Sequence, residues 1–303
     1  MNYFPNGNEE NELVKFIALY QYLYVNDAKY FFKAQSYYKK RIKHLIDKGF
    51  LRKIKLNLVL SEFGIDYAKL FKFEYNKLNR NTTYAERLIR VASIGAFYHN
   101  CNNVKFTPSF AIKDKSIFTT TGRRFIGILD INGIEYLTYQ ISKEHDNRYI
   151  TSVIYDIQKE RTYKNIIIFT NDISRININD FTFGTNQVII LEDTIENKEK
   201  LKYLNSINWE KLINNYFRSN VLLSEYSFCD YTNHKDKYIS TFYFIDTEKI
   251  NRIKCFLREN KNKNAIIICT KDIENELKRY LPSAKYILVD LKPYIDKERI
   301  YYD

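Results

Sequence analysis

The residues that come nearest to a catalytic pattern are Asp130 and the segment Gln140-Ile141-Ser142. An acidic residue near the end of one strand and a Glu-x-Lys or Gln-x-Lys segment on the next can hold a divalent metal ion and activate water, because carboxylate oxygens suit Mg²⁺. Here Ser142 takes the place of the lysine, and Lys143 is one residue out of phase. Since strand side chains alternate between faces, Lys143 would point away from such a site. Two interpretations stay open: a metal-dependent nuclease using Asp130 and Gln140, and a plain turn residue at Asp130, which we favour.

Other patterns that carry chemistry are missing from the sequence. It contains no Cys-x-x-Cys pair, no Gly-x-x-x-x-Gly-Lys-Ser/Thr loop, no Gly-x-Ser-x-Gly elbow and no His-x-His pair. Zinc ribbons and P-loop motors are therefore excluded, and relaxases with a paired-histidine metal site are disfavoured. The four cysteines lie far apart, so we expect no disulfide framework, no bound metal and no cofactor.

Positive charge is concentrated in one short tract. The 303 residues carry 48 Lys and Arg against 36 Asp and Glu, a formal charge of +12. The 23 residues from Lys33 to Lys55 hold nine basic residues and one acidic residue, Asp47, so their net charge is 9 − 1 = +8. A genome-wide composition bias would spread basic residues evenly along the chain. A local cluster is typical of a surface that binds a polyanion.

The elements around this tract are typical of a winged helix-turn-helix. Apolar spacing predicts a helix over 12–24, a short helix over 28–32 capped by Asn26 or Asp27, and a third helix over 37–48 capped by Ser36. Gly49 should end the third helix, because its position favours a left-handed residue. Strands over 50–55 and 57–60 and a helix from Ser61 to about Phe73 follow. In this order of elements the third helix can enter the major groove while the ribbon lies along phosphates.

The candidate DNA contacts lie on the third helix and on the ribbon. Arg and Lys on the helix can donate to guanine edges or to phosphates, whereas the ribbon residues are better suited to phosphate contacts. The alternative is a solvated basic face on a helical bundle or on a protein-binding winged helix. The candidate DNA-binding residues are Ser36, Tyr37, Lys39, Lys40, Arg41, Lys43, His44, Arg52, Lys53 and Lys55.

The pattern changes to β-rich runs from Arg123 onward. Asn132-Gly133 between two apolar runs predicts a two-residue hairpin, followed by a helix over 147–159 and buried strands over 165–170 and 187–191. Residues 166–173 match residues 266–273 at six of eight positions, including a shared Thr-x-Asp-Ile ending, which favours an internal duplication. The expected fold class is α+β or α/β: a winged helix over 1–75, a first α/β unit over 84–196 and a similar second unit over 197–303. Hairpin, helix and strand in this order also suggest a degenerate restriction-endonuclease-like fold.

The segment His44–Leu70, HLIDKGFLRKIKLNLVLSEFGIDYAKL, resembles the replication-relaxation family of plasmids and conjugative elements of Gram-positive bacteria. It is similar to that family's helix, Lys-Gly-Phe-Leu turn, ribbon and Leu-Ser/Thr-x-x-Gly exit, and the α/β region of nuclease-like pattern follows it. The resemblance covers about residues 12–195. It implies a DNA-binding initiator or accessory protein of a mobile element, acting at an origin of replication or transfer.

Three functional hypotheses follow. The first is a sequence-specific binder of double-stranded DNA without its own catalysis, acting as a replication initiator or relaxosome accessory factor, with a second copy of the chain and replication or relaxosome proteins as further partners. The second is the metal-dependent nuclease, and the third is a transcriptional regulator whose α/β region senses a ligand. No apolar run approaches the roughly 18 to 20 residues of a membrane span, and the first twelve residues lack a signal region. We therefore expect a cytoplasmic protein with no membrane partner.

Overall fold

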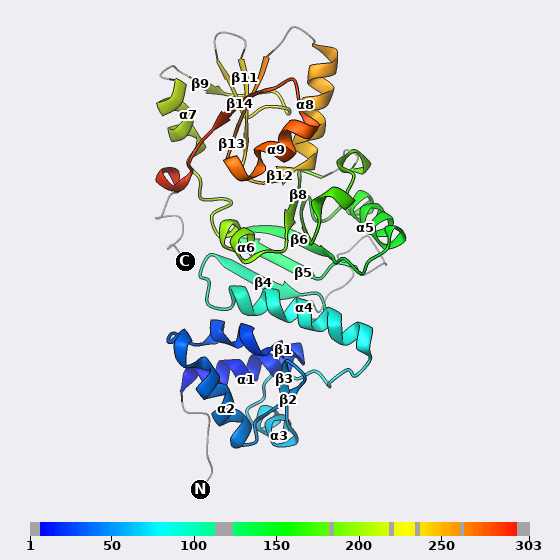
Figure 1. Cartoon of the computed structure of the whole chain (residues 1–303), viewed down its shortest axis with the longest axis vertical. Helices are drawn as coiled ribbons and strands as arrows, with labels where there is room; N and C mark the ends of the chain where they lie inside the picture. Colours follow the sequence, from blue (N-terminus) through cyan, green and yellow to red (C-terminus); the bar gives the residue numbers. More distant parts are fainter. Residues whose placement is uncertain are drawn as a thin grey trace. The chain divides into compact units, whose positions relative to one another are not determined.

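The computed structural model of the chain describes residues 7–112, 124–181, 185–217, 221–233, 237–260 and 264–295. Arg123, where the predicted β-rich region begins, and His234 lie outside these residues. The chain forms two compact units, one of residues 1–101 and 105–108, the other of residues 102–104 and 109–303 (Figure 1). Both units combine helices and strands, and the fold is mixed α and β. None of the helices in the described ranges has the length and apolar content to cross a lipid bilayer.

The first unit contains a small antiparallel sheet with the strand order β1-β3-β2. Its buried core includes Leu13 and Ile17 of the first helix, Leu45, Phe50 and Leu58. The elements are α1 (Asn8–Tyr20), β1 (Leu23–Tyr24), the 3-10 turns η1 (Val25–Phe31) and η2 (Gln35–Tyr37), α2 (Tyr38–Asp47), β2 (Leu51–Ile54), β3 (Asn57–Leu60), α3 (Glu62–Leu70) and α4 (Thr82–Tyr98).

The junction between α2 and α3 follows the sequence prediction. Gly49 adopts φ +79°, and its amide donates to the carbonyl of Ile46 at 2.9 Å, so the left-handed end of α2 is confirmed. Ser61 caps α3 by accepting a hydrogen bond from the amide of Gly64 at 3.0 Å. A Cβ atom on Gly64 would lie 2.1 Å from the carbonyl oxygen of Phe50, so only glycine permits this approach of the helix to the backbone.

Several predicted helix ends are wrong. The first helix ends at Tyr20 rather than at residue 24, because Gln21 adopts φ +71° and Leu23–Tyr24 pair with β3 instead. Neither Asn26 nor Asp27 caps a helix, since both fall inside η1, whose N-cap is Tyr24. Tertiary contacts use their side chains instead. Asn26 accepts from the hydroxyl of Tyr38 at 3.2 Å, and Asp27 accepts from the hydroxyl of Ser93.

The predicted cap of the third helix is also wrong. Ser36 lies within η2, and α2 begins one residue later than expected, at Tyr38, with no side-chain cap. The last helix of the junction ends at Leu70 rather than at residue 73, since Lys72 adopts φ +56°.

The second unit contains two sheets (Figure 1). The strands of this unit have the order β12-β8-β7-β6-β5 in the larger sheet and the order β14-β13-β11-β10-β9 in the smaller. The strand β4 (Val104–Pro108) falls almost entirely in the first unit. The strands of the second unit are β5 (Gly127–Ile131), β6 (Ile134–Ile141), β7 (Asn165–Thr170), β8 (Gln187–Glu192), β9 (Val221–Leu223), β10 (Tyr231–Asn233), β11 (Lys237–Phe242), β12 (Ile245–Asp246), β13 (Asn264–Cys269) and β14 (Lys285–Leu288). The helical elements are α5 (Asn147–Lys159), η3 (Ile173–Arg175), η4 (Ile178–Asp180), α6 (Ile195–Leu201), α7 (Trp209–Phe217), α8 (Thr247–Glu259), α9 (Lys271–Tyr280) and η5 (Lys292–Tyr294).

The predicted hairpin and the helix over 147–159 are confirmed. Ile131 pairs with Ile134 across the two-residue turn Asn132-Gly133, and both turn residues adopt positive φ. The helix α5 has the predicted bounds, and the carboxylate of Asp146 caps it by accepting from the amide of Tyr149 at 2.8 Å.

The two sheets share one strand order. In β8-β7-β6-β5 and in β14-β13-β11-β10 the last two strands are antiparallel, and the other neighbours are parallel. The helices α5 and α8 each have 13 residues, begin 100 positions apart, and follow the aspartate caps Asp146 and Asp246. The half of the second unit that contains α5 and the half that contains α8 bury side chains in a single apolar cluster. Ile150 of α5 and Ile250 of α8 both belong to it.

The side chain of His99, just beyond α4, generates a pH-dependent prediction. Its ring packs against Phe16 and Phe31 at centroid distances of 5.9 and 4.3 Å. Burial lowers the pKa of His99 below 6.5, with Glu12 opposing the shift and Lys15 adding to it. The unfolded chain then binds more protons than the folded one once the pH falls through 6.5, so the stability of the first unit should fall there.

Hydrogen exchange of α1 and α4, followed from pH 7.5 down to pH 5.5, would measure this effect. The wild-type chain should lose protection as the pH falls, and the His99→Gln variant should lose less. Identical pH profiles for the two proteins would contradict the assignment to His99.

Candidate nucleic-acid interface

The helix α2 presents an apolar stripe to the core and a cationic face to solvent. Ile42 and Leu45 are buried, at 4% and 0% exposure. Most of the candidate side chains from this segment are exposed, namely those of Ser36, Tyr37, Lys39, Lys40, Arg41 and Lys43. The helix is therefore amphipathic: Ile42 and Leu45 lie on the side that faces the core, and the cations lie on the side that faces solvent.

The lysines of this face are available to a ligand. None of the ion pairs formed within the described ranges includes Lys39, Lys40 or Lys43. Tyr37, which precedes them, is 63% exposed. Three cations and an aromatic ring therefore stand at the surface of one helix and the turn before it, a combination that suits phosphates and base edges.

Arg41 differs from its neighbours because it pairs within the protein. Its Nη1 lies 3.0 Å from Oε1 of Glu10. Glu10 belongs to α1, and only 1% of its side chain is exposed. A carboxylate buried to this extent needs a charged partner. Arg41 therefore joins α2 to α1, and this long-range contact is invisible in the sequence. His44 is half-buried on the same helix, less open than the lysines.

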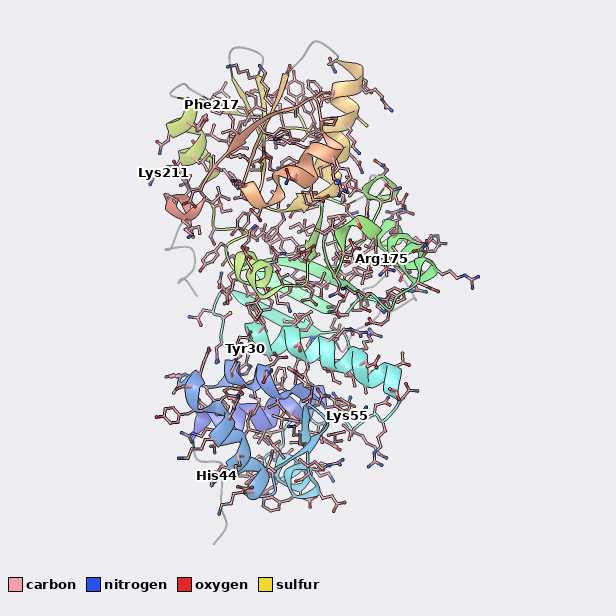
Figure 2. All side chains as sticks on the ribbon, in the orientation of Figure 1. Tyr30, His44, Lys55, Arg175, Lys211 and Phe217 are labelled. Carbon is pink, nitrogen blue, oxygen red and sulfur yellow. The ribbon has the colours of Figure 1, made fainter. Side chains whose placement is uncertain are left out.

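The hairpin supplies a second group of cations. Arg52 and Lys53 are exposed on β2, an edge strand of the sheet, and Lys55 lies in the turn with φ +52°. Figure 2 shows that Lys55 and His44 extend from separate elements of the first unit. Cations on an edge strand also prevent pairing with another chain, so this feature has a purely structural explanation as well.

The residues of the nuclease pattern do not come together. Oδ1 of Asp130 accepts a hydrogen bond from the amide of Gly133 at 2.8 Å, as a turn residue does. Asp130 pairs with Glu135 across the hairpin, and Gln140 lies five positions further along β6, a separation of about 17 Å at strand rise. The side chain of Gln140 donates instead to Oδ2 of Asp193 at 2.7 Å.

The loop that follows Gln140 is held by Arg175 of η3. Its guanidinium donates to the carbonyls of Ser142 and Lys143 at 3.1 and 3.3 Å, and to that of His145. Ser142 is buried and Lys143 is exposed. Within the described ranges, no group of three or more His, Cys, Asp or Glu side chains is arranged to hold a metal ion.

A cavity of about 600 Å³ in the second unit was not foreseen from the sequence. The ammonium of Lys249 lies 2.8 Å from Oδ2 of Asp230 and 2.9 Å from the carbonyl of Thr241 in its wall. Burial raises the pKa of Asp246, which caps α8, although Lys249 and backbone amides oppose that shift. Trp209 and several other aromatic side chains also line the cavity. Only the cap Asp246 leaves a local sequence signal, an acidic residue before a helical run.

The Glu10–Arg41 pair predicts that two adjacent cations differ in their effect on stability. Arg41→Ala leaves the carboxylate of Glu10 without this partner and should lower the free energy of unfolding of the first unit by about 1–3 kcal/mol. Lys40→Ala should change it by less than about 0.5 kcal/mol. Chemical denaturation monitored by hydrogen exchange of α1 would measure both. The double variant Glu10→Gln/Arg41→Ala should be less destabilised than Arg41→Ala alone, and equal effects of Lys40→Ala and Arg41→Ala would contradict the assignment.

Comparison of the chain with protein-family models, with curated proteins and with solved structures found no match. The geometry of the molecule is therefore the basis for a functional assignment. In the first unit it combines exposed cations on α2 with exposed cations on the adjoining hairpin.

Proposed function

We propose that the chain binds double-stranded DNA through its first unit, as a winged helix. The order α1, β1, η1, α2, β2, β3, with the sheet order β1-β3-β2, supports this assignment. The observation that carries the proposal is that Lys39, Lys40 and Lys43 on α2 are exposed and take part in no ion pair within the described ranges. When solvated ammonium groups of this kind bind DNA, they release the cations that are condensed on its phosphates.

The contacts divide by element. Lys39, Lys40 and Lys43 lie on the helix that would enter the major groove, where lysine can reach guanine edges or phosphates. Arg52, Lys53 and Lys55 lie on the hairpin and suit phosphates on either side of the groove. Arg41 remains a candidate contact only because 45% of its side chain is still exposed.

The role in the cell is also a proposal. The resemblance of residues 44–70 to the replication-relaxation family supports a replication initiator or relaxosome accessory factor of a plasmid or other mobile element, without its own catalysis and acting in the cytoplasm. The second unit would then recruit replication or relaxosome proteins. The shared strand order of its two sheets and the 100-residue spacing of α5 and α8 support an origin by internal duplication.

Binding sites selected from randomised duplexes, followed by mobility-shift titration over a series of salt concentrations, would test the DNA-binding proposal. Affinity should fall steeply with salt. Lys40→Ala and Lys53→Ala should each weaken binding, and a phosphate contact at either should reduce the salt slope by about 1. The control is Lys211→Ala, an exposed lysine of α7 in the second unit, which should bind as the wild type does (Figure 2). A Lys39→Ala/Lys40→Ala/Lys43→Ala variant with wild-type affinity would refute the proposal.

A ligand-responsive transcriptional regulator is the second candidate function, and the cavity of about 600 Å³ favours it. Its size and aromatic lining are those of small-molecule sites. Trp209 is the chain's one tryptophan, so its fluorescence reports on the cavity.

This second candidate predicts a linked pair of changes. In a metabolite library screened by the fluorescence of Trp209, a compound that quenches the signal should also shift the midpoint of DNA binding. Ser224→Phe, which places a bulky ring at the cavity wall, should abolish the quenching and the shift together. A compound that quenches Trp209 but leaves DNA binding unchanged would count against the regulator.

A further inference from the structure

The outward face of α3 carries apolar and charged side chains that nothing in the proposed function uses. Gly64, Tyr67 and Ala68 point into the unit and are buried. Phe63 is 53% exposed and Leu70 is 72% exposed, an unusual degree for two large apolar side chains on one short helix. The charged residues Glu62, Asp66 and Lys69 are exposed on the same face.

These side chains are sorted into two edges. At about 100° per residue, Asp66 marks the centre of the exposed face. Phe63 and Leu70 fall within about 20° of one another on one side of Asp66, and Glu62 and Lys69 fall within about 20° of one another on the other. The face therefore has an apolar edge and a charged edge, and on each edge the two members lie seven residues apart.

A two-fold axis makes this face complementary to itself. When two copies of α3 pack antiparallel about an axis through Asp66, each edge meets the same edge of the other copy with its order reversed. Phe63 then meets Leu70 of the second copy, and Glu62 meets Lys69 of the second copy. Apolar groups thus face apolar groups, and each acid faces a base.

We propose that α3 is a self-association surface and that its partner is a second copy of this chain. The charge pattern selects this occupant. Glu62 and Lys69 of one copy find their opposite charges in Lys69 and Glu62 of a second copy, because the two helices are identical and antiparallel. Glu62, Asp66 and Lys69 take part in no ion pair that the described ranges form, so their charges are available to a partner. The proposal does not depend on DNA binding.

The same geometry limits the affinity of the pair. Two copies of Asp66 approach one another at the axis, and like charges repel. A single short helix also buries less surface than a standard interface. The association is therefore weak in the free protein, and removing the charge at Asp66 strengthens it.

Sedimentation velocity of the full-length chain without DNA, over a wide range of protein concentration, tests the proposal. The wild-type chain should show a reversible monomer–dimer equilibrium. Glu62→Lys and Lys69→Glu should each weaken dimerisation about tenfold, and the double variant should return toward the wild-type dissociation constant. Leu70→Ser should abolish the dimer, whereas Asp66→Asn should tighten it.

The matched control is Leu223→Ser, which changes a leucine of β9 in the second unit that is 76% exposed. It should leave dimerisation unchanged, and circular dichroism should show that every variant is folded. A wild-type chain that stays monomeric at all concentrations would overturn the proposal. So would a dimer that Leu70→Ser leaves intact, or one that the exchanged charges of the double variant fail to restore.

Discussion

The first unit depends on one close backbone contact, the approach of α3 to the carbonyl of Phe50. Gly64 permits it because a Cβ atom there would lie 2.1 Å from that oxygen. Ser61 reinforces it by accepting from the amide of Gly64 and donating to the carbonyls of Gly49 and Phe50. This junction joins the end of α2, the start of β2 and the start of α3. The directions of the cationic helix, the hairpin and the outward face of α3 are therefore set together.

The cations of the first unit lie in two environments that composition cannot separate. Arg41 pairs with a carboxylate that is 1% exposed, and so belongs to the contact between α1 and α2. Lys40, its immediate neighbour, faces solvent. Burial decides the difference, because a buried carboxylate holds a cation far more strongly than screened surface charges hold each other. A basic tract can thus hold a residue that pairs inside the protein beside residues that stay in solvent.

In the second unit the two halves are joined more closely than two repeats in sequence would require. The short strand β12, which precedes α8 of the second half, pairs with β8 of the first half. Ile250 and Ile253 of α8 share an apolar cluster with Val188 and Ile190 of β8. A common core of this kind couples the halves energetically, because neither buries its apolar face alone. The buried carboxylate of Asp246 lies at this joint, where it caps α8 and lines the cavity.

Local signals in the sequence determined several elements of this protein. The bounds of α5, the turn at Asn132-Gly133, the glycine end of α2 at Gly49 and the serine cap at Ser61 each follow from a few neighbouring residues, whose backbone preferences act over a turn of chain. Only the tertiary structure decided what those residues contact. It engaged Asp27 with Ser93 instead of a helix end, paired Arg41 with Glu10, and placed Asp130 far from Gln140 along one hairpin. Such contacts join residues remote in sequence, and they form where burial leaves a polar group in need of a partner, a condition that no local pattern records.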